Sequence, residues 1–313
     1  MKPFLRFLKS YPALQIIAAL LIGFSLLSPY FLTSGNFEAM LGANAVVLIA
    51  AIGMTVVFLA GGIDLSISTV ISASAVISGL VMAQTDSVAA GAVTAVVVGL
   101  GFGALNGVLI GYFRLTPFIT TMATQLIARG IAFVLSQGIA VKGTPYWMLD
   151  FGFMSWLGIP AVTLVALVLV ILSVIAMSQT TWGRHVMLVG SNDEAARHAG
   201  INTRFIEFSV YLFAGGMAGA AGFIAIANLG NAIPGVGDTL LLIIIGAVVL
   251  GGTGMTGGEG SVERTVLGVA ILAILTNGLN LLGIPFYDQL IIQGVLIFLG
   301  TYLAMRLGSR GKS

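Results

Sequence analysis

Asp64 is the most conspicuous ionisable residue in the sequence, because its segment, 61–66 (GGIDLS), stands between two long apolar runs. A carboxylate at or near membrane depth is costly and normally faces a cavity, a partner or the membrane surface. One interpretation is a tight turn, in which the glycines permit unusual backbone angles and Asp64 or Ser66 caps the following helix. The other is a role in gating or in a substrate path, which is compatible with capping.

A second glycine-rich break covers residues 251–261 (GGTGMTGGEGS) and interrupts an apolar region in the C-terminal half. Glycine-interrupted hydrophobic segments in both halves of a chain indicate the region of a transporter that moves or binds its solute. A phosphate-binding loop is a weak alternative, since no Gly-Lys-Ser or Gly-Lys-Thr follows and no strand precedes the glycines. The paired breaks therefore favour transport.

Arg129 lies within an apolar stretch with no compensating charge within a helical turn, so we expect it to face a partner or a cavity. Bonding to helix ends or backbone carbonyls is the favoured interpretation, and direct contact with substrate is the other. Four amides in or beside apolar stretches could either join helices or hydrogen-bond a polyhydroxylated ligand. With Asp64 and Ser66, they are the candidate residues of a substrate path or gate: Asn106, Asn228, Asn277 and Asn280.

The segment 183–201 predicts a short polar helix with both ends marked. Ser191 or Asn192 can cap its start, acidic residues follow in the first turn, and Gly200 can end it after basic residues that suit the helix dipole. A small, well-capped polar helix beside apolar spans favours contact with a soluble partner. A merely structural surface helix is the alternative.

The composition indicates that these residues belong to an integral membrane protein. The chain has 313 residues, of which 58% are hydrophobic and only 8% charged, whereas roughly a quarter of residues are charged in soluble domains. The charges leave stretches long enough to cross a hydrocarbon core of about 30 Å. We expect one all-α polytopic bundle over 1–313, with glycine-broken segments and about ten transmembrane helices. The expected spans are 11–32, 40–60, 66–84, 88–112, 117–137, 161–178, 207–229, 238–251, 264–283 and 288–305, of which the third and eighth could be partial or re-entrant.

Lys and Arg are distributed unevenly between the expected loops. When the N-terminus is placed in the cytoplasm, the outer loops hold only Lys142 among the basic residues. Such a bias sets membrane orientation, and it predicts that both termini are cytoplasmic. It also argues against nucleic acid as a partner, despite the net charge of +2.

Enzyme and metal chemistry find little support in the sequence. The chain has no cysteine and only two histidines, which excludes disulfides, thiolate catalysis and histidine-rich metal sites. No nucleophile, base and orienting group assemble at a helical spacing. We therefore expect no catalytic residue, no metal and no cofactor in this chain.

Several separate segments resemble the membrane permeases of bacterial ATP-binding cassette (ABC) importers of the ribose type, within the branched-chain amino acid and sugar permease superfamily. They are 61–66, 105–107, 114–119, 181–184, 192–201, 249–253 and 276–283. As an ordered set, these segments are highly specific.

The resemblance implies an importer of the bacterial cytoplasmic (inner) membrane that moves a monosaccharide or related solute. Two permease subunits, identical or homologous, would form the pathway within the membrane lipid. A periplasmic sugar-binding protein would deliver the sugar, and a cytoplasmic ABC ATPase would use the ATP, because this chain holds no ATPase motif. A coupling loop at about 179–206 would then dock into the ATPase, through Asp193, Glu194, Ala195, Ala196, Arg197 and Gly200.

The sequence departs from the family pattern at the second break. Relatives commonly carry a basic residue where Glu259 stands and a Leu-Gly pair where Glu263-Arg264 stands, which leaves a non-identical permease partner open. The alternative function is an autonomous secondary transporter or channel for a small polar solute. Such a carrier normally shows more carboxylates at membrane depth than Asp64 alone. The sequence does not identify the sugar.

Overall fold

The computed structural model describes residues 12–309, with side chains described over 13–300. Within these residues, ten apolar helices follow the ten expected spans in order, and the all-α polytopic bundle is confirmed. Over the residues with described side chains, seven helices are both long and apolar enough to cross a membrane: α3 (Ser34–Leu59), α4 (Ile67–Thr85), α5 (Val88–Gly107) continued by the π-helix η1 (Val108–Tyr112), α6 (Pro117–Ser136), α8 (Ala161–Gln179), α11 (Thr203–Leu229) and α13 (Val262–Leu281). The other three are α2 (Pro12–Leu27), α12 (Leu240–Leu250) and α14 (Phe286–Ser309). Residue 11 of the first expected span and both chain ends lie outside the described residues.

Helix α12 is shorter than the span expected at 238–251. Its 11 residues reach about 16 Å at 1.5 Å per residue, which is too short for a hydrocarbon core of about 30 Å. Glycines fix both of its ends, because a Cβ on Gly237 would meet the Ser68 carbonyl and a Cβ on Gly251 would meet the Arg264 carbonyl. The eighth apolar segment is therefore a partial span.

Helix α11 is the centre of the bundle and packs closely on α5. A Cβ on Gly215 would lie 2.3 Å from the carbonyl oxygen of Gly99, and one on Gly219 would lie 2.3 Å from that of Ala95. Glycines four residues apart allow two helix backbones to approach in this way. The same spacing continues along α5 at Gly103 and Gly107, which meet the backbone of α11 at Tyr211 and Phe208.

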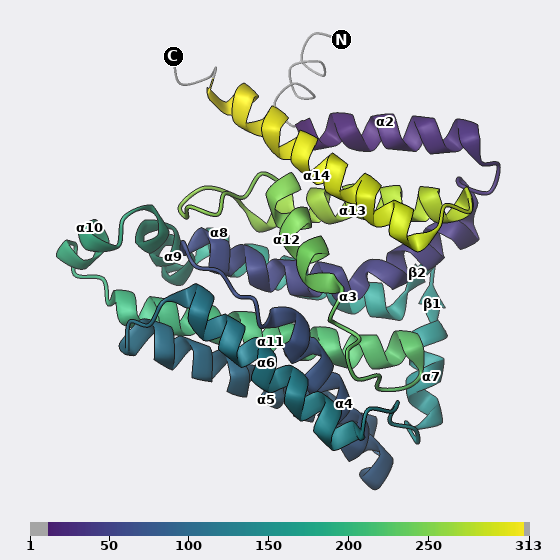
Figure 1. Ribbon diagram of the computed structural model, residues 1–313, viewed down its shortest axis with the longest axis horizontal. Coiled ribbons are helices and arrows are strands. Elements are labelled where there is room, and N and C mark those ends of the chain that lie inside the picture. Colours follow the sequence, from purple (N-terminus) through teal and green to yellow (C-terminus); the bar gives the residue numbers. More distant parts are fainter. Residues whose placement is uncertain (1–11, 310–313) are drawn as a thin grey trace.

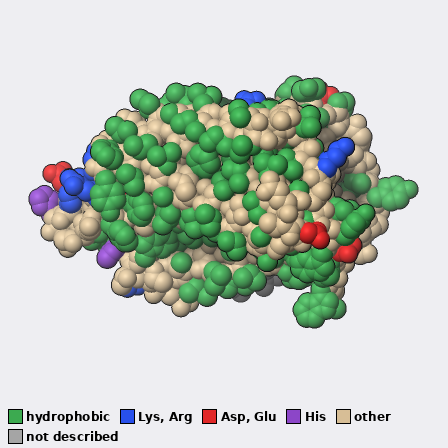
Figure 2. All heavy atoms as spheres, turned by 90° about the horizontal axis from the view of Figure 1, so that it is seen from below, with side chains coloured by type: hydrophobic (Ala, Val, Ile, Leu, Met, Phe, Trp, Pro, Cys, Tyr) green, Lys and Arg blue, Asp and Glu red, His purple; other side chains and the backbone are tan. Residues whose placement is uncertain are grey.

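The outer surface of the bundle is apolar between two polar ends. Large exposed hydrophobic side chains cover the outward faces of α5, α6 and α8, among them Val97, Leu126 and Leu172. Figure 2 shows hydrophobic side chains spread over one such face, with charged side chains gathered mainly towards its two ends. This distribution fits a protein surrounded by lipid.

The two ends of the bundle carry different short elements. Helices α9 (Thr181–Ser191) and α10 (Asp193–His198) lie at one end, and α7 (Tyr146–Phe153) with the two-stranded hairpin of β1 (Ser155–Trp156) and β2 (Ile159–Pro160) lies at the other (Figure 1). The sequence predicted α10 alone among these elements. We call the end with α9 and α10 the coupling end, and the opposite one the hairpin end.

Candidate coupling region and polar path

Helix α10 is the short polar helix expected in the long inner loop. Its cap is Asn192, because Asn192 Oδ1 accepts the N–H of Ala195 at 2.9 Å, whereas Ser191 ends α9. Asp193 in the first turn forms an ion pair with Arg197 in the last turn. An acidic start and a basic end both suit the helix dipole.

Gly200 closes the other end of α10 with a φ of +83°. Its N–H donates to the carbonyl of Arg197 at 3.0 Å, and the N–H of Ile201 donates to the carbonyl of Ala196 at 3.1 Å. This pair of bonds is a Schellman motif, whose left-handed position favours glycine. A β-branched residue at position 200 would be strained.

The two faces of α10 differ in what they can contact. Glu194, Ala195 and Arg197 are exposed. Ala196 is only 4% exposed and belongs to a cluster with Val186 and Val189 of α9. Ala196 therefore packs α10 against its own chain, whereas Ala195 and Gly200 of the expected coupling set are exposed.

Helix α9 connects α10 to both glycine-rich breaks. A Cβ on Gly190 would lie 1.9 Å from the carbonyl oxygen of Leu59, and the N–H of Gly258 donates to that same oxygen at 2.9 Å. A Cβ on Gly61 would lie 3.7 Å from the Gly190 carbonyl oxygen. The two glycine-rich breaks therefore meet at Gly190, two residues before the cap residue Asn192.

Arg114 joins the start of α11 to the start of α10. Its Nη1 donates to Glu207 Oε1 at 2.7 Å and lies 3.7 Å from Asp193 Oδ2, while its Nη2 donates to Thr203 Oγ1 at 3.0 Å. Burial acts to raise the pKa of Asp193, but the Thr203 hydroxyl, Arg197 and the charge of Arg114 outweigh it and lower the pKa below its usual range. The sequence pointed to Arg114 only as part of the resembling segment 114–119, because its partners lie about 80 to 90 residues away along the chain.

Asp64 begins a buried chain of side-chain hydrogen bonds. Its Oδ1 accepts the N–H of Ser66 at 2.9 Å and the Ser66 hydroxyl at 2.6 Å. Asn106 Nδ2 donates to Ser66 Oγ at 2.9 Å, and the Thr124 hydroxyl donates to Asn106 Oδ1 at 2.6 Å. These bonds bring Asp64, Ser66 and Asn106 together and join the first break to α5 and α6. Of the two cap candidates, Asp64 accepts the backbone N–H at the start of α4, whereas the Ser66 side chain makes no cap bond.

Two of the expected path residues are bonded between helices. Asn277 exchanges two hydrogen bonds with Asn36, at 2.9 and 2.8 Å, which join α13 to the start of α3. Asn280 Oδ1 accepts from Gln289 Nε2 at 2.7 Å, which joins α13 to α14. These two amides lie apart from the group around Asp64 and act as contacts between helices.

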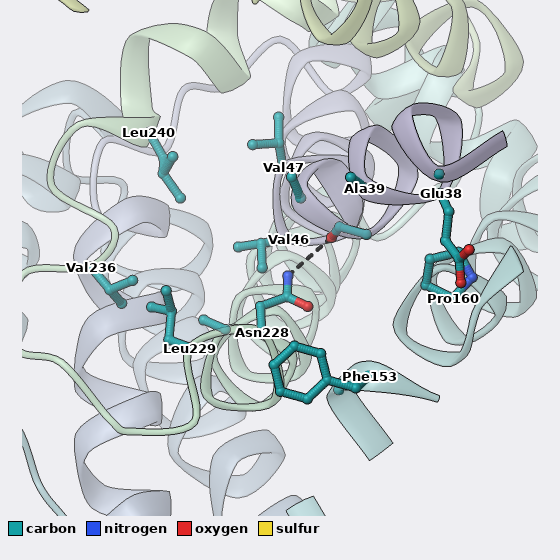
Figure 3. A pocket seen from close by; sticks show the side chains of 15 residues that line it. Glu38, Ala39, Val46, Val47, Phe153, Pro160, Asn228, Leu229, Val236 and Leu240 are labelled. Carbon is teal, nitrogen blue, oxygen red and sulfur yellow. Dashed lines mark hydrogen bonds between the residues drawn. The ribbon is translucent and has the colours of Figure 1, made fainter. Parts of the chain in front are cut away.

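Asn228 lines a cavity of about 620 Å³ near the hairpin end. Its Nδ2 donates to the carbonyl of Gly42 at 3.0 Å, and Phe153 and Leu229 lie beside it (Figure 3). Glu38 is another polar residue of the cavity lining, and its side chain lies beside Pro160 (Figure 3). The cavity has the room for a small polar molecule, with polar groups on a largely apolar lining.

Arg129 has a carboxylate partner, not the backbone carbonyls that the favoured interpretation expected. Its Nη2 lies 3.0 Å from Asp238 Oδ2. Asp238 belongs to the segment between α11 and α12. The ion pair therefore connects α6 to the residues that directly precede the partial span α12. The guanidinium carbon also lies 5.8 Å from the ring centroid of Phe133.

Comparisons with known proteins give one consistent result. Residues 36–300 match the family described as branched-chain amino acid transport system/permease component. The chain is 36% identical to the ribose import permease protein RbsC of Bacillus subtilis (strain 168), over 91% of this chain and 89% of that protein. It is 32% identical to the D-allose transport system permease protein AlsC of Escherichia coli (strain K12), over 96% and 93%, and 30% identical to the L-arabinose transport system permease protein AraH of the same strain, over 92% and 88%. No solved structure matches this chain.

Proposed function

The chain belongs to the family of branched-chain amino acid transport system permease components, and we propose that it carries a monosaccharide of the ribose, allose or arabinose type. It is the permease component of an ABC importer, a multi-pass membrane protein whose ATPase is a separate subunit. Although the family description names amino acids, the relatives that match over nearly the whole chain are named for ribose, D-allose and L-arabinose. That agreement supports a sugar as the solute.

The observation that carries the mechanism is the contact of α9 with both glycine-rich breaks at Gly190. We infer that the ATPase docks on α10, through the exposed Glu194, Ala195 and Arg197 and with the ends of the helix set by Asp193 and Gly200. Ala196 serves inward packing instead. A movement of α10 would then reach α3 and the second break through rigid backbone contacts, without any flexible link.

The sidedness of the importer follows from the same assignment. The coupling end faces the cytoplasm, where the ATPase uses ATP, and the hairpin end faces the periplasm and the sugar-binding protein. Both termini, which lie outside the described residues, are cytoplasmic on the basis of the Lys and Arg bias. A second permease subunit, identical or homologous, completes the pathway.

The expected path residues lie in three separate places, and we assign each group a different role. Asn228 and the cavity at the hairpin end belong to the sugar path, because an amide and a carboxylate there can hydrogen-bond sugar hydroxyls. Asp64, Ser66 and Asn106 form the link between the first break and its neighbouring helices near the coupling end. Asn277 and Asn280 hold helices together.

Reconstituted transport tests this function. The permease is co-purified with its cognate ATPase and sugar-binding protein, placed in proteoliposomes, and given radiolabelled D-ribose, D-allose or L-arabinose. We expect accumulation of at least one of these sugars that needs both ATP and the binding protein. Concentrative uptake by the permease alone, driven by a proton or sodium gradient, would establish the secondary transporter instead.

A further inference from the structure

Arg129 presents a charge on the exposed side of a membrane-spanning helix. Its side chain is 55% exposed even with Asp238 as ion-pair partner. Arg129 lies 12 residues after the start of α6 at Pro117 and 7 before its end at Ser136, or about 18 and 10 Å along the axis. A guanidinium in contact with lipid at this depth is costly, and such residues face a bundle interior or a water-filled cavity.

Arg129 is part of a stripe along one side of the outer half of α6. Gln125, Arg129 and Phe133 follow one another at intervals of four residues, so each is rotated by only about 40° from the last. Apolar residues flank the stripe: Leu126, Ile127 and Val134 are 66%, 50% and 76% exposed, and they lie roughly 60°, 160° and 140° around the helix from Arg129. Helix α6 therefore has a polar and aromatic side and an apolar side, both uncovered.

The stripe carries the groups that bind a neutral polyol. A guanidinium has five N–H donors, and a contact with one carboxylate occupies at most two of them, so exposed donors remain on Arg129. Phe133 is 38% exposed directly beside the guanidinium and offers an apolar ring face to the C–H groups of a sugar. Because Asp238 neutralises Arg129, the site does not require a charged ligand.

We propose that the stripe of Gln125, Arg129 and Phe133 lines the aqueous sugar path, and that Arg129, held by Asp238, hydrogen-bonds the passing sugar. The proposal rests on the proposed function, since it takes the solute to be a monosaccharide. The apolar side of α6, with Ile127 and Val134, faces lipid.

Thiol accessibility tests the placement of the stripe, and the chain suits the test because it contains no cysteine. Gln125→Cys and Phe133→Cys are compared with Ile127→Cys and Val134→Cys in the complete transporter in lipid nanodiscs. The reagent is a charged methanethiosulfonate, which reacts with a thiol only where contact with water allows the thiol to ionise. We expect the stripe positions to react at least about tenfold faster than the controls, and D-ribose, D-allose or L-arabinose, whichever is transported, to slow them. Both controls are more exposed than Phe133 in the isolated chain, so equal or slower labelling of the stripe would overturn the proposal.

A charge exchange separates contact with sugar from a purely structural ion pair. Arg129→Asp combined with Asp238→Arg keeps an ion pair at the site, so membrane abundance should recover relative to Arg129→Asp alone. The KM for sugar uptake should nevertheless stay raised by about tenfold, the loss expected for one charge-assisted hydrogen bond. Recovery of the wild-type KM would contradict sugar contact. If the wild-type complex imports no sugar of the panel, the proposed function fails, whereas the labelling pattern still decides which side of α6 meets water.

Discussion

The carbonyl oxygen of Leu59 accepts the backbone N–H of Gly258 at 2.9 Å. This bond joins the last residue of α3 to the second glycine-rich break, and Gly190 of α9 closes over it so tightly that no side chain fits. Leu59 is itself only 1% exposed. A displacement of α9 would therefore press on α3 and the second break together, which would be a short path into the membrane domain for an ATPase docked on α10 as proposed.

Adding one methyl group at Gly190 should disturb this junction. In Gly190→Ala the new Cβ would lie 1.9 Å from the Leu59 carbonyl oxygen, and such overpacking costs about 1–3 kcal/mol when the backbone has to shift. We expect sugar uptake and sugar-stimulated ATP hydrolysis to fall together while the basal ATPase rate of the partner persists. Gly101→Ala is the matched control, since a Cβ there meets nothing within 4 Å. Equal activity of the two variants would show that the junction does not transmit motion.

Bulk on the outward face of α10 should weaken both docking of the ATPase and transport. Ala195 is exposed, so that Ala195→Trp leaves the fold of the permease unchanged but prevents close docking of the ATPase. Ala195→Ser, which adds little volume, should remain nearly normal. Membrane abundance, co-purification with the ATPase and sugar uptake are measured in the same cells. Near-normal uptake by Ala195→Trp would mean that α10 is only a surface feature.

Replacing Gly200 should act through the position of α10 instead. Gly200→Val places a β-branched residue at a φ of +83° and spoils the Schellman closure of the helix. We expect lower uptake and weaker co-purification with the ATPase, at normal membrane abundance because the hydrocarbon spans are untouched. Wild-type uptake and wild-type ATPase binding in this variant would contradict a fixed coupling helix.

Asn106 should matter more for stability than its single side chain suggests. Asn106→Ala removes two buried side-chain hydrogen bonds, the one that Asn106 donates to Ser66 Oγ and the one that it accepts from the Thr124 hydroxyl. Both hydroxyls keep a second bond, to Asp64 and to the Thr120 carbonyl, so each lost bond costs about 0.5–1.5 kcal/mol. The thermal inactivation midpoint of the detergent-solubilised permease should fall clearly. Thr124→Ser, which keeps the hydroxyl that donates to Asn106 Oδ1, should lower it less. An Asn106→Ala protein as stable as the wild type would show that the chain from Asp64 contributes nothing to folding.

The Asn36–Asn277 pair distinguishes helix contact from substrate contact. A double-mutant cycle with Asn36→Ala and Asn277→Ala should give a coupling free energy of about 0.6–2 kcal/mol, as for other polar pairs between membrane helices. The KM for sugar should stay the same in all three variants. A raised KM for sugar without a measurable coupling free energy would indicate instead that Asn277 contacts the sugar.

Hydropathy and charge spacing predicted the order of the apolar helices well, because a long uncharged stretch has few other stable states in lipid. The boundaries depended on capping that hydropathy does not report. Helix α3 begins six residues before the expected 40, since Thr33 caps it by accepting the N–H of Asn36. The shortness of α12 depends on close backbone contacts at Gly237 and Gly251 with other helices, which no local pattern contains.

Only those features of the candidate site that depend on residues close in sequence could be predicted. Asn192, the dipole-matched charges and Gly200 of α10 are neighbours in sequence, so their roles could be assigned from spacing. The partners of Arg129, Asn277 and Arg114 are distant in sequence. For the amides, the side chains alone left contact between helices and contact with substrate equally open. The inward side of α10 at Ala196 depends on α9, a helix that the sequence did not separate from its loop.

Photo-crosslinking from position 194 tests most directly whether α10 is where ATP hydrolysis reaches the membrane subunit. Glu194 is replaced by p-benzoyl-phenylalanine in the assembled importer, with the same replacement of Trp156, an exposed residue at the hairpin end, as the matched control. We expect position 194 to give an adduct with the ATPase and position 156 to give an adduct with the sugar-binding protein only. An ATPase adduct from position 156, or none from position 194 in a complex that still imports sugar, would contradict the assignment of α10 as the coupling helix.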